Sequence, residues 1–177
     1  PYNLNYVNIS KGEQLEPSFL KISPNNRMPA IIDPDGPDGK EISIFESGAI
    51  LQYLGRKTEM FYPSDYRKQI EVDQWLFWQV GNLGPMGGQA HHFRNYSQTK
   101  LQYAIDRYTN EVNRLYGVLN KKLSDGREYI AEDYTIADMA CIGWVRNPER
   151  KGQDLENFPY LKLWFERMMA CLLYTSP

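Results

Sequence analysis

Two short stretches in the first fifty residues contain groups of the kind that hold a small polar ligand. In Met28-Pro29 a proline opens a run of β-branched residues, and in Glu46-Ser47 a carboxylate and a hydroxyl precede a helical pattern. A helix N-terminus presents unpaired N–H groups and a partial positive charge, so a ligand carboxylate can bind beside Ser47 while Glu46 holds an ammonium. The pair suits the head group of an α-amino acid, but an ordinary helix cap uses the same residues.

The Met28-Pro29 bond allows two interpretations. A proline at the first position of a strand needs no N–H for the ladder, so a plain strand start accounts for it. If the bond were cis, the backbone N–H and C=O of Met28 would turn outward, where they could pair with an extended peptide ligand. The sequence leaves both interpretations open.

The elements that must position these residues lie in the first sixty, where most of the strand-like sequence is found. Short β-branched runs predict strands at 6–9, 29–33 and 41–45, and turn residues separate the last two, which we expect to pair antiparallel. A brief helix is expected over 17–22, since a proline stands at its start. A further helix is predicted to open at Ser47 with a polar cap.

Beyond residue 66 almost everything reads as helix. Aromatic residues stand among charges over 68–80, and apolar residues recur at spacings of three and four over 103–123 and 161–172. Thr135-Ile136-Ala137-Asp138 places a hydroxyl at a helix start and a carboxylate three residues later, which is a capping pattern with a structural role.

Composition excludes several classes of function. The 177 residues carry 20 Lys and Arg against 22 Asp and Glu, a formal net charge of −2, and no basic block, so a nucleic-acid partner is not expected. No apolar run reaches the ~18 residues of a membrane span, and the N-terminus lacks the pattern of a signal peptide, which makes a cytoplasmic address the default.

The cysteines and histidines show no pattern of a metal or redox site. Cys141 and Cys171 stand thirty residues apart without a CxxC pair, so buried free thiols are the expected reading. His91 and His92 are neighbours on a predicted helix, where consecutive side chains face different directions and cannot chelate one ion. We therefore expect no metal.

Several segments together resemble the cytosolic glutathione transferases. Residues 23–31, the turn after them and residues 45–54 look like the thioredoxin-like half of that family, and the helical remainder with its capping pattern is similar to the second domain. The resemblance spans roughly residues 4–170. It implies an α/β, thioredoxin-like glutathione-binding domain over 1–60, a linker at 61–66 and an all-helical C-terminal domain over 67–172.

Three further segments, residues 75–81, 83–86 and 88–93, resemble the bacterial nu-class branch, whose members act as glutathione-dependent disulfide-bond reductases. The resemblance implies that the backbone of Met28, before a cis proline, binds the cysteinyl part of glutathione, and that Glu46 and Ser47 hold its γ-glutamyl end. Gln14 and Arg107, which by themselves would be interpreted as surface residues, also become candidates through the resemblance. The full set of implied glutathione-binding residues is Gln14, Met28, Pro29, Glu46, Ser47 and Arg107.

Both ends of the chain depart from the family pattern. The family begins with a strand and a helix, with the thiol-activating residue in their connection, whereas this sequence starts at Pro1 shortly before the strand expected at 6–9. By ordinary element lengths we expect about 20–25 residues to be missing, the catalytic residue among them, and the chain by itself to be inactive. The ending over 171–177 also departs, and we expect it not to be native.

The implied activity is glutathione-dependent thiol–disulfide exchange. The first half of the chain has no cysteine, so the reacting sulfur must come from glutathione, as substrate or cosubstrate. Two alternatives stay open. One is a conjugating glutathione S-transferase with a pocket for small electrophiles, and the other is a glutathione-binding regulatory protein without turnover. A homodimer is expected when the chain is complete.

Overall fold

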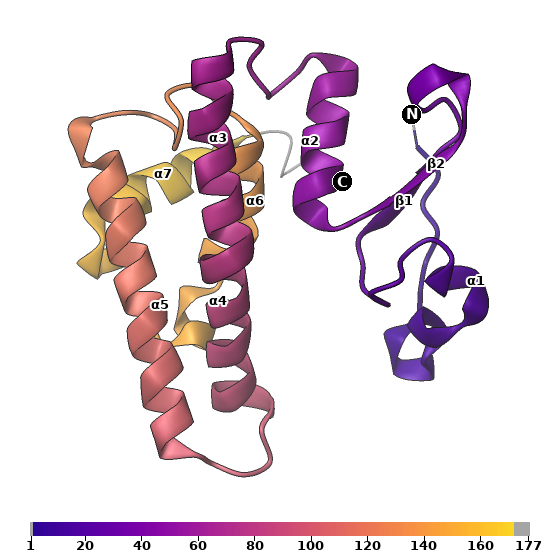
Figure 1. Cartoon of the computed structure of the whole chain (residues 1–177). Helices are drawn as coiled ribbons and strands as arrows, with labels where there is room; N and C mark the ends of the chain where they lie inside the picture. The colour runs from indigo at the N-terminus through magenta and orange to yellow at the C-terminus, as the bar shows by residue number, and fades with distance from the viewer. Residues whose placement is uncertain (1, 172–177) are drawn as a thin grey trace. The chain divides into compact units, whose positions relative to one another are not determined.

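The computed structural model describes residues 2–171, and contacts between residues divide the chain into two units, one ending at Thr58 and one beginning at Glu59 (Figure 1). Each unit is described by itself. The domain limits predicted above, with a linker at 61–66, stay a prediction. Residue 172, which ends the last apolar stripe, and the rest of the tail to residue 177 lie outside the described residues.

The N-terminal unit is built on a two-stranded antiparallel sheet. Strand β1 (Ala30–Asp33) pairs with β2 (Ile42–Phe45), with Ala30 opposite Phe45 and Asp33 opposite Ile42. Helix α2 (Ser47–Thr58) follows β2 directly and packs on both strands. The predicted pairing and the predicted helix start are therefore confirmed, and together they give the thioredoxin-like part of the fold.

The segment before the sheet differs from the prediction. Residues 6–9 form no strand, because the Asn8 side chain accepts a hydrogen bond from the Ser10 N–H at 3.1 Å and caps the 3₁₀ turn Ile9–Lys11. Local bonds from an Asn side chain offer the backbone an alternative to a sheet ladder, and here they outweigh the β-branched residues. Helix α1 (Pro17–Leu20) begins at the predicted proline and ends two residues before the predicted 22.

The C-terminal unit is helical throughout its described length, apart from turns and isolated bridges (Figure 1). Its core contains Val112, Leu115 and Leu119 from one face of the longest helix, fully buried at the predicted spacing. None of the described helices is long and apolar enough to cross a bilayer. The helices are α3 (Tyr66–Trp78), α4 (Gly84–His91), α5 (Gln102–Lys122), α6 (Ile136–Val145) and α7 (Pro159–Ala170).

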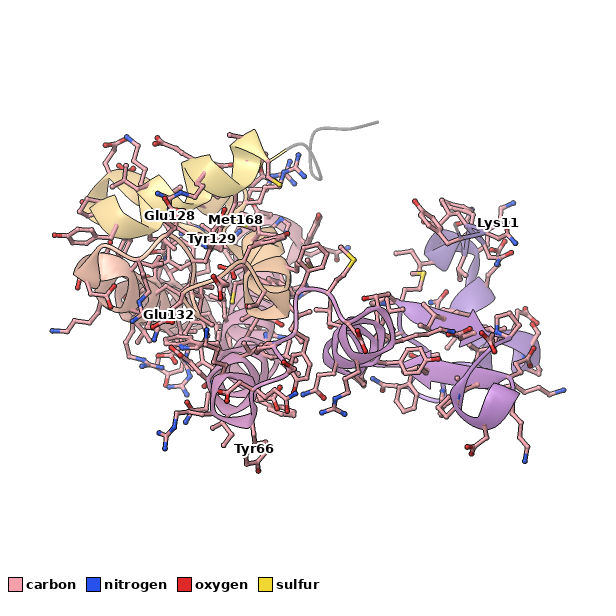
Figure 2. All side chains as sticks on the ribbon, turned by 90° about the horizontal axis from the view of Figure 1, so that it is seen from above. Lys11, Tyr66, Glu128, Tyr129, Glu132 and Met168 are labelled. Carbon is pink, nitrogen blue, oxygen red and sulfur yellow. The ribbon has the colours of Figure 1, made fainter. Side chains whose placement is uncertain are left out.

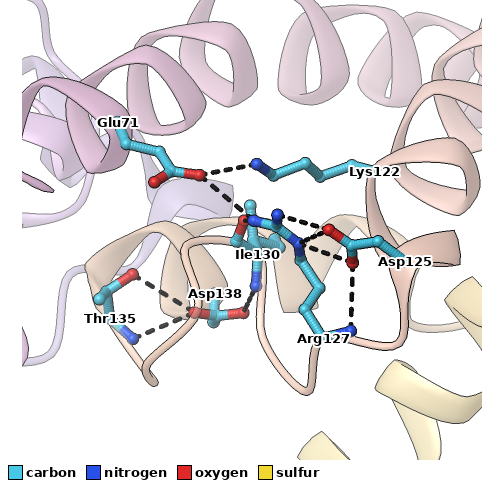
Figure 3. Close-up of polar contacts among 7 residues, drawn as sticks. All are labelled: Glu71, Lys122, Asp125, Arg127, Ile130, Thr135 and Asp138. Carbon is cyan, nitrogen blue, oxygen red and sulfur yellow. Dashed lines mark hydrogen bonds and ion pairs between the residues drawn. The ribbon is translucent and has the colours of Figure 1, made fainter.

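The predicted cap of α6 is confirmed. The Thr135 hydroxyl accepts from the Ala137 N–H at 3.3 Å, and Asp138 Oδ2 accepts from the Thr135 N–H at 3.0 Å. Asp138 Oδ1 also accepts from the Ile130 N–H at 2.9 Å, which fixes the loop before the helix (Figure 3). The carboxylate therefore satisfies backbone donors that would otherwise be unpaired in the core.

Two π-helical turns, Gln79–Leu83 and His92–Tyr96, lie on either side of α4 and were not predicted. In each turn an asparagine donates its side-chain amide to the carbonyl four residues earlier. Asn82 Nδ2 lies 3.3 Å from the Trp78 oxygen, and Asn95 Nδ2 lies 2.9 Å from the His91 oxygen. The asparagine side chains thus bond backbone carbonyls where the hydrogen-bond pattern changes from that of an α-helix to that of a π-helix.

The glycine pair of α4 lets Trp144 lie close to this helix. A Cβ added to Gly87 would stand 3.1 Å from the Trp144 ring, and one added to Gly84 would stand 3.3 Å from it. A side chain at Gly87 would press on the tryptophan, and one at Gly84 would also meet Gln79 Nε2, which would stand 2.8 Å from its Cβ. The glycines therefore allow α4 and α6 to approach closely.

Candidate functional site

Four of the predicted residues lie at one end of the β1–β2 sheet. Because Ala30 is opposite Phe45 in an antiparallel pair, the residues preceding β1 and following β2 are neighbours. These residues are Met28-Pro29 and Glu46-Ser47. The Met28-Pro29 bond is cis, which confirms the predicted isomer, and Met28 is 46% exposed. The pairing of the Met28 backbone with a peptide ligand stays a prediction.

Glu46 has a backbone conformation that residues other than glycine rarely adopt. Its φ is +70°, in the left-handed region, and its carbonyl accepts the first helical bond of α2 from the Ile50 N–H at 2.9 Å. Its carboxylate is exposed and accepts from Asn25 Nδ2 at 3.3 Å. Such conformations carry an energetic cost and cluster at binding sites, which keeps Glu46 a candidate site residue.

Ser47 stands at the first position of α2 with a hydroxyl that makes no hydrogen bond to another described residue. The ordinary N-cap role that the sequence allowed for Ser47 is therefore wrong, because Glu46 occupies the cap position. The exposed hydroxyl lies beside the first N–H groups of a twelve-residue helix, which have no partner within the helix. This combination favours a bound carboxylate.

Gln14 lies in the same unit, in the 3₁₀ turn Glu13–Leu15. Its side-chain oxygen is buried and has no hydrogen-bond partner among the described residues. A buried acceptor without a donor is costly, so a position of this kind needs an explanation. No hydrogen bond between described residues links Gln14 to the four residues at the sheet end.

Arg107 belongs to the second unit, on the exposed side of α5. Its guanidinium makes no ion pair or hydrogen bond with another described residue, as the solvated reading of its sequence position expects. It nevertheless lines a cavity of about 720 Å³, which is in the size range of small-molecule sites. The other lining residues are Met86, Tyr103, Asp106, Tyr108, Asn110, Glu111 and Arg114.

A polar cluster that the sequence did not reveal ties α2 to the far end of β1. Asp33 Oδ2 accepts from the Tyr53 hydroxyl and from Lys57 Nζ, each at 2.6 Å. The bonds from Lys57 and Tyr53 lower the pKa of Asp33 from 3.8 to about 2. Asp33 stands on a strand, 20 positions before Tyr53 and 24 before Lys57, so no local pattern signals the contact. They hold the helix whose N-terminus faces the candidate site.

A second cavity, of about 650 Å³, lies along α3 and the end of α5 and has Trp75 and Trp78 in its wall. At its edge Lys122 Nζ contacts Glu71 at 2.7 Å, and Arg127 approaches the same carboxylate at 3.2 Å (Figure 3). These bonds, led by that from Lys122, lower the pKa of Glu71. The cavity therefore combines an aromatic wall with a paired carboxylate, that of Glu71, among its lining residues.

The cysteines and histidines all belong to the C-terminal unit, far in sequence from the residues at the sheet end. Cys141 is fully buried in α6, and burial raises the pKa of its thiol well above the ordinary value, so it is a protonated core residue. Burial also lowers the pKa of His91, with Arg150 and Lys151 adding to the effect. Within residues 2–171 no group of three or more His, Cys, Asp and Glu side chains is placed to hold a metal ion.

Comparison with known proteins gives the same family for both units. The family model of the glutathione S-transferase N-terminal domain matches residues 1–56, and that of the C-terminal domain matches residues 84–171. A curated relative, the disulfide-bond oxidoreductase YfcG of Escherichia coli strain K12, is 49% identical over 170 residues, which is 96% of this chain and 79% of the relative.

Two solved structures are also similar. A glutathione transferase of Burkholderia graminis, with two glutathione molecules bound per subunit, superposes with a TM-score of 0.93 at 39% identity and covers 99% of this chain and 76% of its own. A glutathione transferase of Pseudomonas putida, with one glutathione disulfide bound per subunit, gives a TM-score of 0.93 at 37% identity, with 99% and 79% covered.

Proposed function

The chain belongs to the glutathione transferase family, and we propose that it serves as a glutathione-dependent thiol–disulfide oxidoreductase. The observation that carries the proposal is the sheet end, where an exposed Ser47 hydroxyl without a partner in the described part of the chain stands beside Glu46, which has a positive φ. The unit that contains them has no cysteine. Such a site can hold glutathione, and with no protein thiol at hand the ligand must supply the sulfur. The relative YfcG is named a disulfide-bond oxidoreductase.

The proposed reaction is two successive exchanges. The thiolate of bound glutathione attacks one sulfur of a disulfide, forms a mixed disulfide and releases the other half as a thiolate, which takes up a proton. A second glutathione attacks the mixed disulfide, forms glutathione disulfide and releases the second thiol. Two glutathione molecules are oxidised and one disulfide is reduced, so no further cofactor is needed.

In this proposal the residues at the sheet end hold glutathione from its two ends. The Met28 backbone before cis Pro29 pairs with the cysteinyl part, Glu46 holds the ammonium of the γ-glutamyl group, and Ser47 bonds its carboxylate. Gln14, whose side-chain oxygen has no partner within the described residues, and Arg107, whose guanidinium is exposed, complete the proposed glutathione-binding set.

A conjugating transferase is the second candidate. The cavity with Trp75 and Trp78 in its wall is the observation that favours it, because aromatic side chains suit the apolar body of a small electrophile. The cavity beside Arg107 instead carries two arginines and two carboxylates, Asp106 and Glu111, and this mixture of charges suits a peptide disulfide. A glutathione-binding protein without turnover would need neither cavity.

One experiment separates the three functions. The protein, completed with the N-terminal residues expected from the family pattern, is incubated with glutathione and either bis(2-hydroxyethyl) disulfide or 1-chloro-2,4-dinitrobenzene, and glutathione disulfide or the aromatic adduct is measured. Disulfide reduction well above the uncatalysed rate, with little adduct, is the expected result. Adduct formation alone would replace the proposal with conjugation. Glutathione binding by calorimetry without either product would replace it with a regulatory role.

We propose further that the protein works as a homodimer in the cytoplasm. Apolar and aromatic side chains stay exposed along α3, among them Ile70 and Phe77, and Tyr66 at 75% exposure points away from the helices (Figure 2). Such exposed groups favour a protein interface. Cys141 is a free thiol, in keeping with a reducing compartment. Light scattering after size exclusion should give twice the chain mass, and cell fractionation should recover the protein with soluble enzymes.

A further inference from the structure

The exposed side of α5 carries charges at helical spacing. Glu111 stands four residues after Arg107 and three residues before Arg114, so both guanidinium groups are within reach of its carboxylate. All three residues line the cavity of about 720 Å³. Glu111 can therefore pair with either arginine, and the two guanidinium groups compete for one carboxylate.

In the structure Glu111 forms an ion pair with Arg114. Its Oε1 accepts from Arg114 Nη2 at 2.7 Å and its Oε2 accepts from Arg114 Nε at 2.9 Å, a two-bond geometry that uses both oxygens. Arg107 makes no ion pair or hydrogen bond through its guanidinium with any described residue. The Arg114 bond is the main cause that lowers the pKa of Glu111, and the charge of Arg107 adds a smaller effect. Arg107 is thus near the carboxylate without being bound by it.

We propose that Arg114 is a positioning residue for ligand recognition, because by occupying both oxygens of Glu111 it leaves the Arg107 guanidinium free for a carboxylate of glutathione. This inference rests on the proposed function, in which Arg107 is a glutathione-binding residue. A planar guanidinium bonds a carboxylate with two parallel N–H groups, and it can do so only if those groups are not already engaged.

Without Arg114, the Glu111 carboxylate would compete with glutathione for the Arg107 guanidinium. The freed carboxylate would face Arg107 across one helical turn, where an exposed pair of opposite charges is weakly stable. A glutathione carboxylate would then have to displace it and would meet an uncompensated negative charge. We expect the dissociation constant of glutathione to rise roughly twofold to fivefold, since exposed pairs of this kind are modest.

The test is a set of variants measured by titration calorimetry with glutathione. Arg114→Gln should weaken binding by that factor, and Arg114→Gln with Glu111→Gln should restore the affinity of the unmodified protein. Glu111→Gln alone should bind at least as tightly. Lys121→Gln removes one positive charge elsewhere on α5 and should change nothing. An unchanged affinity in Arg114→Gln, or a loss that Glu111→Gln does not rescue, would overturn the proposal.

Two further measurements distinguish this inference from the proposed function. Arg107→Ala tests the binding role of Arg107 directly, and in that background Arg114→Gln should have no additional effect. A second loss of similar size in that background would overturn the positioning role and leave the binding role intact. In ligand-free protein the side-chain Nε–H NMR signal of Arg107 should shift and exchange more slowly in Arg114→Gln, whatever the ligand is. An unmoved signal would refute the competition by itself.

Discussion

The indole nitrogen of Trp164 donates a hydrogen bond of 2.9 Å to Asp138 Oδ1. Both side chains are buried, and the bond joins α7 to the first turn of α6. Burial raises the pKa of Asp138, although the bonds from Ile130, Trp164 and Thr135 each lower it. The carboxylate is therefore a shared acceptor at the centre of the helical unit, and its removal leaves several donors unpaired.

We predict that Asp138→Ala lowers the free energy of unfolding by at least about 3 kcal/mol, since each buried donor left without a partner costs about 1–3 kcal/mol. Urea unfolding followed by circular dichroism measures the change. Asp133→Ala is the matched control, because Asp133 is exposed and its nearest cation, Lys68, lies 3.8 Å away. Equal losses in the two variants would show that Asp138 has no special role.

The cluster around Asp33 gives a prediction about pH. Its pKa in the folded state, about 2, lies below its ordinary value of 3.8, so the stabilisation it brings is present above pH 3.8 and is lost as pH falls toward 2. Carboxyl ¹³C NMR should follow this titration directly. Lys57→Met should raise the pKa of Asp33 toward 3.8, whereas Lys40→Met, at an exposed site outside the cluster, should leave it unchanged. A pKa near 3.8 in the unmodified protein would contradict the cluster.

At the sheet end, Ser47→Ala should weaken glutathione binding by about 1–2 kcal/mol, which is the range for losing one hydrogen bond to a charged group. Glu46→Gln should also weaken it, because the ammonium loses its counter-charge. Calorimetric dissociation constants give both values. Ser43→Ala, at an exposed site on β2, controls for general effects. Unchanged affinity in both site variants would remove the assignment.

Arg107→Lys should lose affinity for glutathione and Arg107→Ala should lose more, because an ammonium cannot reproduce the two-bond geometry of a guanidinium. The loss should shrink as salt shortens the Debye length from ~10 Å to ~3 Å, since the residue borders open solvent. Lys121→Ala on the same helix should show neither effect. Equal dissociation constants for all variants at both ionic strengths would return Arg107 to the solvated surface.

No protein cysteine is expected to take part in turnover. The Cys141 thiol is buried and held protonated, and neither cysteine lies in the N-terminal unit. In the N-terminally completed protein, the double variant Cys141→Ala with Cys171→Ala should therefore reduce a small disulfide with glutathione at a rate similar to that of the protein without these two substitutions. Loss of this activity in a variant with unchanged circular dichroism would mean that a protein thiol reacts.

The sequence predicts best where the pattern is local or repeated. The pair of β1 and β2, the start of α2 and the Thr135–Asp138 cap all follow from neighbouring residues, and the structure confirms them. The strand at 6–9 fails because its β-branched residues favour a ladder, whereas the Asn8 side chain accepts from the Ser10 N–H and caps a 3₁₀ turn. Propensity alone cannot rank these two outcomes.

The candidate site shows the same limit. Glu46 and Ser47 stand out by their types and by the helix start, but the left-handed backbone of Glu46 and the free hydroxyl of Ser47 depend on how the chain turns between β2 and α2. The Asp33, Tyr53 and Lys57 contact and the choice of Glu111 between two arginines depend on three-dimensional distances. No spacing rule fixes them.

The two π-helical turns beside α4 set the rotation of the residues that follow them around the helix axis. Each turn holds about one residue more than an α-turn, and one residue rotates everything downstream by about 100° around the axis. Deleting a residue from Gln79–Leu83 would therefore swing Gly84 and Gly87 off the line that meets Trp144 and put bulkier side chains there. The extra residue keeps the following helix in phase, so this stretch of the chain tolerates substitution more readily than a change in length.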